Sequence, residues 1–328
     1  MIKWGIIGVG DVCEKKSGPA FQKAEGSELV AVMRRTGAKA KDFAERHGVP
    51  KWYDDAEKLI NDPEINAIYV ATPPNGHAPY AAMAAAAGKP VYVEKPMARN
   101  HAECLSMIET CKKAGVPLFV AYYRRALPNF LKIKELVDSG SIGTIRFVDV
   151  KVHKSLEPDI VGQSDNHENW RTNPEIAGAG YFYDLASHQL DYLDFLLGPI
   201  TKASGIAKNF GGIYQAEDTT LGTFSFESGA MGMGSWCFAT SENSELEMTT
   251  IYGSKGRIAF PFFEGTNVDL FIDGKAKQSF NFEMPEHIQQ PLIQGIVNQL
   301  NNKGESVSTG TSAARTNWAL EQISKRID

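Results

Sequence analysis

The stretch Val91-Tyr92-Val93-Glu94-Lys95-Pro96-Met97 decides the fold. Its first three residues form the short apolar run, rich in β-branched side chains, that is typical of a buried parallel strand. Pro96 has no amide proton for a strand ladder, so we expect the strand to end here and the chain to turn. Open α/β sheets bind ligands at the carboxyl ends of their strands, which puts Glu94 and Lys95 at a predicted ligand-binding edge. The alternative is a solvated Glu–Lys pair before a loop proline.

The first residues of the chain predict a dinucleotide-binding turn. The apolar run Trp4–Val9 leads into Gly8 and Gly10, which begin the pattern G-x-G-x-x-G between a strand and a helix. Gly8 permits the tight turn, and Gly10 lets the backbone approach a pyrophosphate. Cys13 occupies the third position, where glycine or alanine is usual, and its small side chain still allows close packing. The cofactor-binding residues expected in this turn are Gly8, Gly10, Asp11 and Val12.

A break in the helical pattern follows this turn at Gly18-Pro19. We expect Asp11–Gly18 to be a loop or short turn, with Pro19 at the first position of the next helix. Lys15 and Lys16 lie in that loop. They are either solvated, or one of them reaches a cofactor phosphate.

The second strand is expected at Glu28–Met33, and the residues after it indicate which cofactor binds. An NAD site usually carries an acidic residue here, which accepts a hydrogen bond from the ribose 2′-hydroxyl. This chain has Arg34 and Arg35 instead, and a guanidinium is suited to pairing with a 2′-phosphate. Two adjacent arginines could simply be surface charge, but their position favours NADP(H), with NAD(H) still possible.

A proline-rich loop follows the third expected strand, Ala67–Ala71. Its sequence, Thr72-Pro73-Pro74-Asn75-Gly76-His77, predicts a rigid connection at the same carboxyl edge of the sheet. His77 is either an ordinary residue near the start of the helix Pro79–Ala87 or part of the nicotinamide pocket. The residues that we assign to the cofactor site beyond the glycine turn are Arg34, Arg35, Thr72, Pro73, Asn75, His77, Glu94, Lys95 and Pro96.

The pattern of strands and helices predicts an α/β protein of two domains, residues 1–123 and 124–328. Strands and helices alternate up to Tyr123, which indicates a doubly wound parallel sheet. Beyond it, longer β segments and hairpin glycines indicate a large, mainly antiparallel open sheet, whose apolar face we expect to pack against a partner subunit. These β segments are Thr144–Lys154, Thr201–Lys208, Asp218–Glu227, Ala230–Ala239, Glu245–Ile251, Arg257–Phe260 and Val268–Ile272. Helices are expected at Gln289–Asn301 and Ser312–Arg326, and the C-terminal helix could pack back on the first domain.

One helical run in the second half carries candidate catalytic groups. Asp184 and His188 are four residues apart and therefore lie on one helix face, which Asp191 and Asp194 continue. Histidine suits proton transfer near neutral pH, and a carboxylate can orient its ring. The plainer interpretation is a hydrogen-bonded pair within a helix.

Two polar and aromatic stretches are candidates for substrate recognition. They are Tyr122-Tyr123-Arg124-Arg125 and His167-Glu168-Asn169-Trp170-Arg171, and they suit a hydroxylated ring or an anionic one, or are simply surface loops. The substrate-binding residues that we assign are Tyr123, Arg124, Trp170, Arg171, Asp184 and His188.

Composition excludes several classes of protein. With 328 residues, 43% of them hydrophobic, the chain is long enough for two soluble domains. A net charge of -5 gives no basic footprint for nucleic acid or a membrane surface, and no apolar run reaches membrane length. The four cysteines and the histidines lack metal-ligand spacing, so we expect reduced thiols and no metal. Because Met1-Ile2-Lys3 runs directly into a strand, we expect no signal peptide and a cytoplasmic protein.

Together these motifs resemble the Gfo/Idh/MocA oxidoreductase family. The similar elements, in order, are G-V-G-D from Gly8, A-T-P-P-N-G-H from Ala71, E-K-P from Glu94 and D-x-x-x-H from Asp184. The resemblance covers essentially the whole chain, and it is far more specific than the glycine pattern alone. Cys13 and Arg34 depart from the family's pattern, and Arg34 puts a preference for NAD in doubt.

The resemblance implies a Rossmann domain followed by an α/β domain whose open sheet serves in oligomerisation. It also implies NAD(P)-dependent oxidation or reduction at a carbinol or carbonyl of sugars, cyclitols and related compounds. Lys95 and His188 would be the catalytic pair, supported by Asp184. Glu94 and Pro96 would shape the nicotinamide end of the site.

The leading hypothesis is an NADP-dependent dehydrogenase or reductase for a polyol, sugar-like or diol substrate, assembled as a homodimer or homotetramer. Lys95 would stabilise negative charge on the substrate oxygen, and His188 would exchange its proton. One alternative is a dihydrodiol- or inositol-type dehydrogenase with a cyclic, non-sugar substrate. A non-catalytic NADP-binding sensor is another, but it has no need of Lys95, Asp184 and His188 together. The substrate, the direction of reaction and recycling of the cofactor within one turnover stay open.

Overall fold

The computed structural model describes residues 1–155 and 169–325, so His167 and Glu168 lie outside the described residues. The described chain forms two compact units. The first contains Met1–Tyr123 and Pro285–Ala314, and the second contains Arg124–Met284 and the segment that begins at Arg315. The structure therefore differs from the expected division in residues 285–314, which lie with the first unit.

Residues 285–314 join the first unit because they hydrogen-bond to its last strand and to its N-terminal part. Phe119 and Thr309 form an antiparallel bridge, and the Ser308 hydroxyl donates to the carbonyl oxygen of Val120 at 2.7 Å. The backbone N–H of Glu25 donates to the side-chain oxygen of Gln294 at 2.7 Å. These contacts join positions far apart in the sequence, which the linear order of elements does not reveal.

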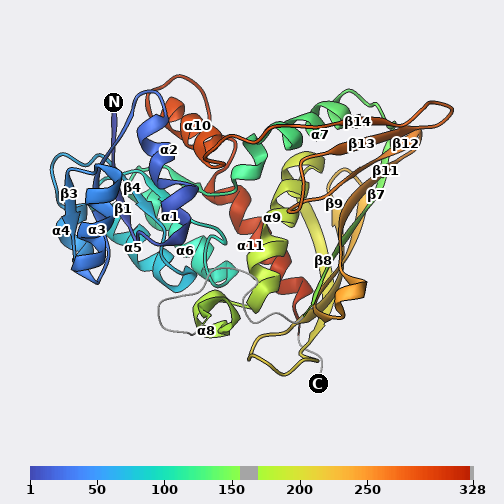
Figure 1. The fold of residues 1–328 in the computed structure, drawn as a ribbon, viewed down its shortest axis with the longest axis horizontal. Helices are drawn as coiled ribbons and strands as arrows, with labels where there is room; N and C mark the ends of the chain where they lie inside the picture. Colours follow the sequence, from blue (N-terminus) through green and yellow to red (C-terminus); the bar gives the residue numbers. More distant parts are fainter. Residues whose placement is uncertain (156–168, 326–328) are drawn as a thin grey trace. The chain divides into compact units, whose positions relative to one another are not determined.

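A six-stranded parallel sheet forms the centre of the first unit, with strand order β3-β2-β1-β4-β5-β6 (Figure 1). The strands are β1 (Ile2–Ile7), β2 (Ser27–Met33), β3 (Lys51–Tyr53), β4 (Ala67–Val70), β5 (Val91–Val93) and β6 (Leu118–Val120). The helices are α1 (Asp11–Lys15), α2 (Gly18–Lys23), α3 (Gly37–His47), α4 (Ala56–Ile60), the 3₁₀ turn η1 (Pro74–Gly76), α5 (His77–Ala86), α6 (His101–Lys113) and α10 (Gln290–Leu300). Strand order reverses between β1 and β4, the position at which doubly wound sheets bind nucleotides.

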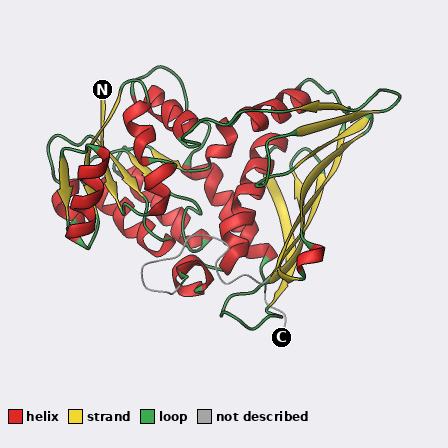
Figure 2. Cartoon of the chain, in the orientation of Figure 1, coloured by secondary structure: helices red, strands yellow, loops and turns green. Residues whose placement is uncertain are grey.

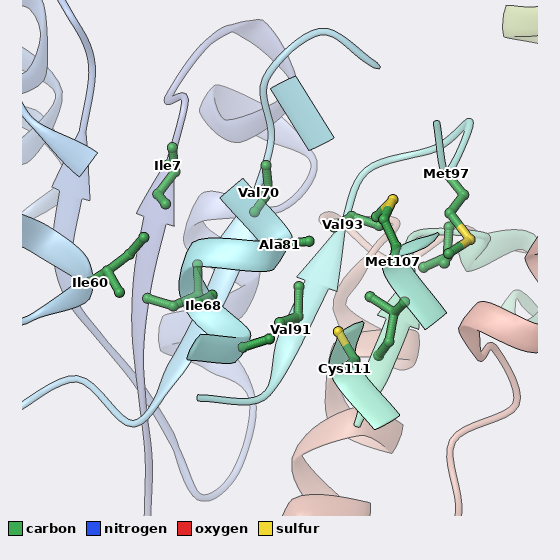
Figure 3. Close-up of a cluster of buried hydrophobic side chains, with 14 of the residues drawn as sticks. Ile7, Ile60, Ile68, Val70, Ala81, Val91, Val93, Met97, Met107 and Cys111 are labelled. Atoms are coloured by element: carbon green, nitrogen blue, oxygen red, sulfur yellow. The ribbon is translucent and has the colours of Figure 1, made fainter. Parts of the chain in front are cut away.

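The core of this unit explains why its strands read as continuous apolar runs. Figure 2 shows helices on both sides of the parallel strands, so neither sheet face meets water. Ile68 and Val70 of β4 and Val91 and Val93 of β5 are completely buried, and Ala81 of α5 packs close to them (Figure 3). Each such aliphatic side chain contributes about 1.5–3 kcal/mol on burial.

The turn after β1 differs from the sequence-based expectation. Asp11–Lys15 forms a short helix rather than a loop. Asp11 and Glu14 lie in its first turn, where the unpaired N–H groups favour negative charge. The next helix begins at Gly18, so Pro19 takes its second position and not its first.

The second unit is built on an eight-stranded sheet with strand order β14-β13-β12-β11-β7-β10-β9-β8. Neighbouring strands are antiparallel except β7 and β10, which run parallel, so the predicted mainly antiparallel sheet is confirmed. The strands are β7 (Ile145–Ser155), β8 (Ile200–Lys208), β9 (Thr219–Phe226), β10 (Met231–Thr240), β11 (Leu246–Gly253), β12 (Gly256–Phe260), β13 (Val268–Ile272) and β14 (Gln278–Phe280). The helical segments are α7 (Pro128–Asp138), η3 (Trp170–Thr172), α8 (Pro174–Ala177), α9 (Gly180–Leu197) and η4 (Glu242–Ser244). Two further segments, η2 (Tyr123–Ala126) and α11 (Gly310–Ile323), begin in the first unit and end in the second.

One face of this sheet is covered by α9, and the other is exposed. Trp236 of β10 donates its indole N–H to Gln189 of α9 at 2.8 Å, and Figure 1 shows α9 lying against the sheet. Exposed and buried residues alternate along β10, as expected for a half-buried strand. Large apolar side chains on the exposed face are Phe147, Ile206, Leu221, Met231 and Met233. Met231 pairs directly with Phe147, and Ile206 pairs directly with Leu221.

Two ion pairs fix α9 in the second unit. Arg125 binds both carboxylate oxygens of Asp191, at 2.8 and 2.5 Å, and each side chain is only 2% exposed. Arg315 binds Asp194 at 3.1 and 2.6 Å. Burial raises the pKa of Asp191 to about 6. The two aspartates that continue the polar face of the helix are therefore anchors rather than reacting groups.

Candidate functional site

The predicted cofactor residues of the first unit gather at the carboxyl ends of its parallel strands. Gly8 and Gly10 follow β1, Arg34 follows β2, and Lys95 follows β5. The loop that begins at Thr72 follows β4, the strand between β1 and β5. Parallel strands end at a common edge, so these residues share one edge of one sheet.

The two glycines of the first turn are required for different reasons. Gly8 has φ +96°, and a Cβ atom there would lie 2.8 Å from Cγ2 and 2.9 Å from the backbone nitrogen of Thr72. Gly10 has an ordinary φ of −124°, and a Cβ atom there would meet no described atom within 4 Å. The fold thus demands glycine at position 8 but not at position 10. A bare backbone facing open space at Gly10 fits the close approach of a pyrophosphate.

Cys13 fills the third position of the glycine pattern as a small buried side chain. Its Sγ atom lies 3.9 Å from the carbonyl oxygen of Gly8, and the residue is fully buried. Burial raises the pKa of the thiol to about 12, so the group is neutral and unreactive at physiological pH.

Arg34 reaches from the end of β2 to the glycine turn. Its Nη1 atom donates to the carbonyl oxygen of Val9 at 3.3 Å, and the side chain is partly exposed. The guanidinium therefore lies beside the glycine turn, at the end of the strand where a residue that contacts the ribose is expected. Arg35, the next residue, is exposed.

The loop after β4 carries a buried polar atom that suits a ligand. The Thr72 hydroxyl is buried and has no hydrogen-bond partner within residues 1–155 and 169–325. Asn75, farther along the loop, is exposed, and Pro73 precedes η1. Buried hydroxyls are normally satisfied, so the Thr72 hydroxyl together with the space at Gly10 fits a nucleotide cofactor at this edge.

His77 joins this loop to the segment after β5. It is completely buried, with Nε2 at 2.8 Å from the carbonyl oxygen of Thr72 and Nδ1 at 3.1 Å from that of Met97. Burial lowers the pKa of the imidazole, which favours the neutral ring. A neutral ring donates to only one of the two carbonyls. The geometry of His77 is that of a link between two loops of the site.

Glu94 turns inward at the end of β5. Its Oε1 atom accepts hydrogen bonds from the Tyr69 hydroxyl at 2.5 Å and from Nε2 of Gln289 at 2.7 Å. Its Oε2 atom accepts from the backbone N–H of Lys95 at 3.1 Å. Lys95 is partly exposed, and the Lys95–Pro96 peptide is cis. The carboxylate thus holds the backbone from which the lysine projects, and Tyr69 and Gln289 were not identified from the sequence.

The second unit gathers most of the predicted substrate residues around α9. Asp184 and His188 are both buried on this helix. Arg171 lies with Nε at 3.4 Å from Oδ2 of Asp184, and its guanidinium stacks 4.3 Å from the centre of the Trp170 ring. The structure therefore brings Trp170, Arg171 and Asp184 together. Tyr123 is buried at the end of the first unit.

Phe263 is a site residue that sequence reasoning missed. Its ring centre lies 6.2 Å from that of His188, edge to face, and 4.7 Å from the guanidinium carbon of Arg124. Arg124 also donates to the carbonyl oxygen of Phe262 at 2.6 Å. The only signal in the sequence is the aromatic pair Phe262-Phe263 between two β segments, and it does not indicate a partner.

Glu247 of β11 holds the turn that carries this phenylalanine. Its carboxylate accepts from the backbone N–H groups of Phe262, Phe263 and Glu264, at 2.6, 3.1 and 3.2 Å. Three donors to one carboxylate define the turn closely. The aromatic ring beside His188 is thus positioned by backbone contacts that have no sequence pattern.

The described residues contain neither a cluster of metal-binding side chains nor a membrane-spanning helix. No group of three or more histidine, cysteine, aspartate or glutamate residues that could hold a metal ion occurs within residues 1–155 and 169–325. Within the same ranges, no helix combines the length and the apolar character needed to cross a bilayer.

Two family models match the chain. Residues 2–122 match the model described as "Oxidoreductase family, NAD-binding Rossmann fold". Residues 130–259 match the model described as "GFO/IDH/MocA C-terminal domain". The two matches fall on the parallel sheet and on the open sheet, respectively.

Individual proteins give a consistent result. "Oxidoreductase P35" of Formosa agariphila is 42% identical over 298 residues, which cover 90% of this chain and 90% of that protein. "Trans-1,2-dihydrobenzene-1,2-diol dehydrogenase" of Xenopus tropicalis is 25% identical over 323 residues, again covering 90% of each. A solved structure, "Levoglucosan dehydrogenase, complex with NADH", matches with a TM-score of 0.87 at 20% identity, over 98% of this chain and 95% of that one. Its likeness shows the fold.

The two glycines provide a matched test of the cofactor site. Gly8→Ala is expected to lower the thermal unfolding midpoint, because the added methyl group meets the backbone of Thr72 and φ is positive. Gly10→Ala is expected to leave the midpoint nearly unchanged but to weaken binding of NADH and NADPH about tenfold or more, because the methyl group fills space that faces the ligand. Nicotinamide fluorescence titration and calorimetry measure the two effects. Unchanged cofactor affinity in Gly10→Ala would show that the turn does not contact the cofactor.

Proposed function

The chain belongs to the Gfo/Idh/MocA family of NAD(P)-dependent oxidoreductases, and from that premise we propose that it is an NADP-dependent dehydrogenase or reductase for a neutral polyol or sugar-like substrate. One observation carries the proposal. Lys95 projects from a turn fixed by a buried carboxylate, at the sheet edge where Gly10 leaves its backbone bare. An amine held at a nucleotide-binding edge suits stabilisation of negative charge on a reacting oxygen.

Lys95 and His188 have separate roles in this proposal. The residues at the carboxyl ends of β1, β2 and β5 would hold the nicotinamide cofactor, which would supply hydride transfer to or from the carbinol or carbonyl carbon of the substrate. Lys95 stabilises negative charge on the oxygen attached to that carbon, and His188 removes or returns its proton. Asp184, one helical turn before His188, supports it and is itself placed by Arg171.

A neutral substrate is favoured over an anionic one by the partners of the two candidate arginines. Arg171 pairs with Asp184, and Arg124 donates to the Phe262 carbonyl oxygen and lies over the Phe263 ring. Both positive charges are thus engaged within the protein. The Phe263 ring beside His188 offers an apolar surface of the kind that packs on the C–H face of a sugar, cyclitol or cyclic diol ring.

Similar proteins include one named for each of the two substrate classes, sugar-like and cyclic non-sugar compounds. The relative named as a dihydrobenzenediol dehydrogenase and the similar structure named as levoglucosan dehydrogenase stand for the two kinds. We favour the sugar-like class and keep a dihydrodiol- or inositol-type dehydrogenase as the second candidate. Turnover on a panel of sugars, cyclitols, keto-sugars and diols, followed by nicotinamide absorbance, separates the two.

The proposal includes a reducing, cytoplasmic setting and a homo-oligomer. No cysteine of the described chain forms a disulfide, and Cys13, Cys104 and Cys111 are buried. The exposed face of the eight-stranded sheet is a contiguous apolar surface, which soluble proteins normally bury against a partner. We propose that a second copy of the chain covers it, in a homodimer or homotetramer.

Loss of either proposed catalytic residue should lower turnover without loss of cofactor binding. Lys95→Ala and His188→Ala are each expected to reduce kcat by about 10²–10⁴-fold, the usual range for removal of a charge-stabilising or acid–base group. Steady-state kinetics on a substrate found in the panel measure the effect. Fluorescence titration and thermal unfolding serve as controls for cofactor binding and folding. A variant with near-normal turnover would remove that residue from the mechanism.

Arg34 is expected to select NADP(H) over NAD(H). A charge-assisted hydrogen bond to the 2′-phosphate contributes roughly 1.5–3 kcal/mol, which corresponds to about tenfold or more in affinity. Arg34→Asp should weaken NADPH binding and narrow or invert the preference, with Arg146→Asp, an exposed site in the second unit, as the matched charge control. Titration with both cofactors measures it. Equal affinity for NADPH and NADH in the unmodified protein would reduce Arg34 to a surface charge.

Charges on the exposed sheet face should disrupt the oligomer. Met231→Lys combined with Met233→Lys is expected to yield a monomer at micromolar concentration, because each protomer would bury two unpaired ammonium groups. Leu131→Lys, at an exposed apolar residue of α7, is the control and should leave the mass unchanged. Light scattering gives the mass. A monomeric unmodified protein would refute the proposed assembly.

A further inference from the structure

We infer that Gln289 is a positioning residue for Lys95, acting through the buried carboxylate of Glu94. The inference rests on the proposed function, since it concerns the amine that the proposal places at the substrate oxygen. Gln289 lies 195 residues after Glu94 in the chain and is completely buried. Its side chain hydrogen-bonds to Glu94, at the start of the turn that carries Lys95.

The hydrogen bonds around Glu94 form one connected set. Oε1 of Glu94 accepts from the Tyr69 hydroxyl at 2.5 Å and from Nε2 of Gln289 at 2.7 Å, and Oε2 accepts from the backbone N–H of Lys95 at 3.1 Å. The Tyr92 hydroxyl donates to Oε1 of Gln289 at 3.2 Å. Because Tyr92 occupies the acceptor end of the amide, the donor end must face Glu94. Tyr92 therefore orients Gln289, and Gln289 orients the carboxylate that binds the backbone of Lys95.

The segment that delivers Gln289 is itself tied to the nucleotide turn. Nδ1 of His287 lies 2.8 Å from the carbonyl oxygen of Lys15, and the backbone N–H of Gln289 donates to that of Lys16 at 3.4 Å. Lys15 and Lys16 end α1, the helix that begins directly after Gly10. One short segment thus contacts both α1, which follows the glycine turn, and Glu94, which precedes Lys95. It therefore helps to fix the distance between the glycine turn and Lys95 within the first unit.

A buried glutamine could instead be only a satisfied core residue. A positioning role and a purely structural role predict different effects on turnover when a group that can be protonated replaces Gln289. In Gln289→Glu, a neutral carboxyl group still donates one hydrogen bond to Glu94, but an ionised one sets two carboxylates against each other. A positioning role therefore makes turnover depend on the charge at residue 289. If the role is merely structural, the substitution changes the stability of the protein but does not alter the pH profile of kcat.

The titratable groups near Gln289 are not expected to cause a loss of kcat at alkaline pH. Burial raises the pKa of Cys13 to about 12, and it raises the pKa values of Tyr69 and Tyr92 well above their usual range. Burial lowers the pKa of His77, which favours the neutral ring. The other titratable groups near the set, among the described residues, are Glu94, Lys95, Tyr123 and His287. A new alkaline loss of activity in Gln289→Glu, absent from the unmodified protein, reports the introduced carboxyl group.

The experiment compares the unmodified protein with Gln289→Glu, Gln289→Met and Tyr92→Phe, and uses Gln290→Glu as the matched control at the adjacent, half-buried glutamine. Gln289→Met is expected to lower kcat about tenfold at every pH, with KM changed little, because one hydrogen bond to a charged group is lost. Gln289→Glu is expected to approach the unmodified kcat at the acid end and to lose it as pH rises. Tyr92→Phe, which keeps the ring in the core, is expected to show a smaller loss, and Gln290→Glu none.

A second measurement needs neither substrate nor cofactor. The rate at which acetic anhydride modifies Lys95, followed by peptide mass spectrometry across pH, reports the environment of the amine directly. Gln289→Glu should shift this profile, and Gln290→Glu should not. If the unmodified protein turns over no substrate, the proposed function fails while this measurement still tests the inference.

The inference is overturned if kcat, its pH profile and the Lys95 modification profile of the Gln289 variants all match those of Gln290→Glu. It is also overturned if the Gln289 variants do not fold and Tyr92→Phe, which should fold, shows no change in kcat or in Lys95 modification. A shifted Lys95 profile together with an alkaline loss of kcat in Gln289→Glu supports it.

Discussion

The first unit depends on the hydrogen bonding of one carboxylate, that of Glu94, at the end of a fully buried strand. Removing a carboxylate from water costs several kcal/mol unless it is paired or hydrogen-bonded. Tyr69 and Tyr92, stacked with ring centres 4.7 Å apart, bring polar hydroxyls to an otherwise apolar core and thereby meet this demand together with Gln289. The tyrosines in the interior of the sheet and the backbone of Lys95 at its edge are thus joined by one set of hydrogen bonds.

The second unit solves a comparable problem with ion pairs. Helix α9 is buried along most of its length, yet it carries Asp184, His188, Asp191 and Asp194. Asp191 and Asp194 are paired with arginines, and these ion pairs fix the rotation of the helix about its axis and its position along that axis. Buried ion pairs add little to stability compared with apolar contacts, but they tolerate few alternative positions. The helix can therefore present Asp184 and His188 in one orientation.

The parts of the structure that sequence predicts are those specified by neighbouring residues. Apolar runs gave the strands, and the spacing of Asp184 and His188 gave their common helix face. The sequence does not predict helix α1, because its five residues are too few to show a helical period. The sequence does not identify three further residues, Phe263, Glu247 and Gln289. Their partners are distant in sequence, and their contacts are with the backbone or with buried side chains. Asp191 and Asp194 continue the polar face of α9, and the sequence does not show that their partners are Arg125 and Arg315.

The return of residues 285–314 to the first unit makes that unit discontinuous, and this has a consequence for biosynthesis. Chains fold as they are made, N-terminal part first, and residues 1–123 emerge long before the segment that bridges Phe119 and supplies Gln289. Until then the parallel sheet keeps an open edge, and the Glu94 carboxylate lacks one of its donors. Because the entropy of closing a loop grows only slowly with its length, the intervening unit adds little to the thermodynamic cost of this closure. Its effect is on timing: the first unit is the first to begin, but it is completed only after residues 285–314 have been made.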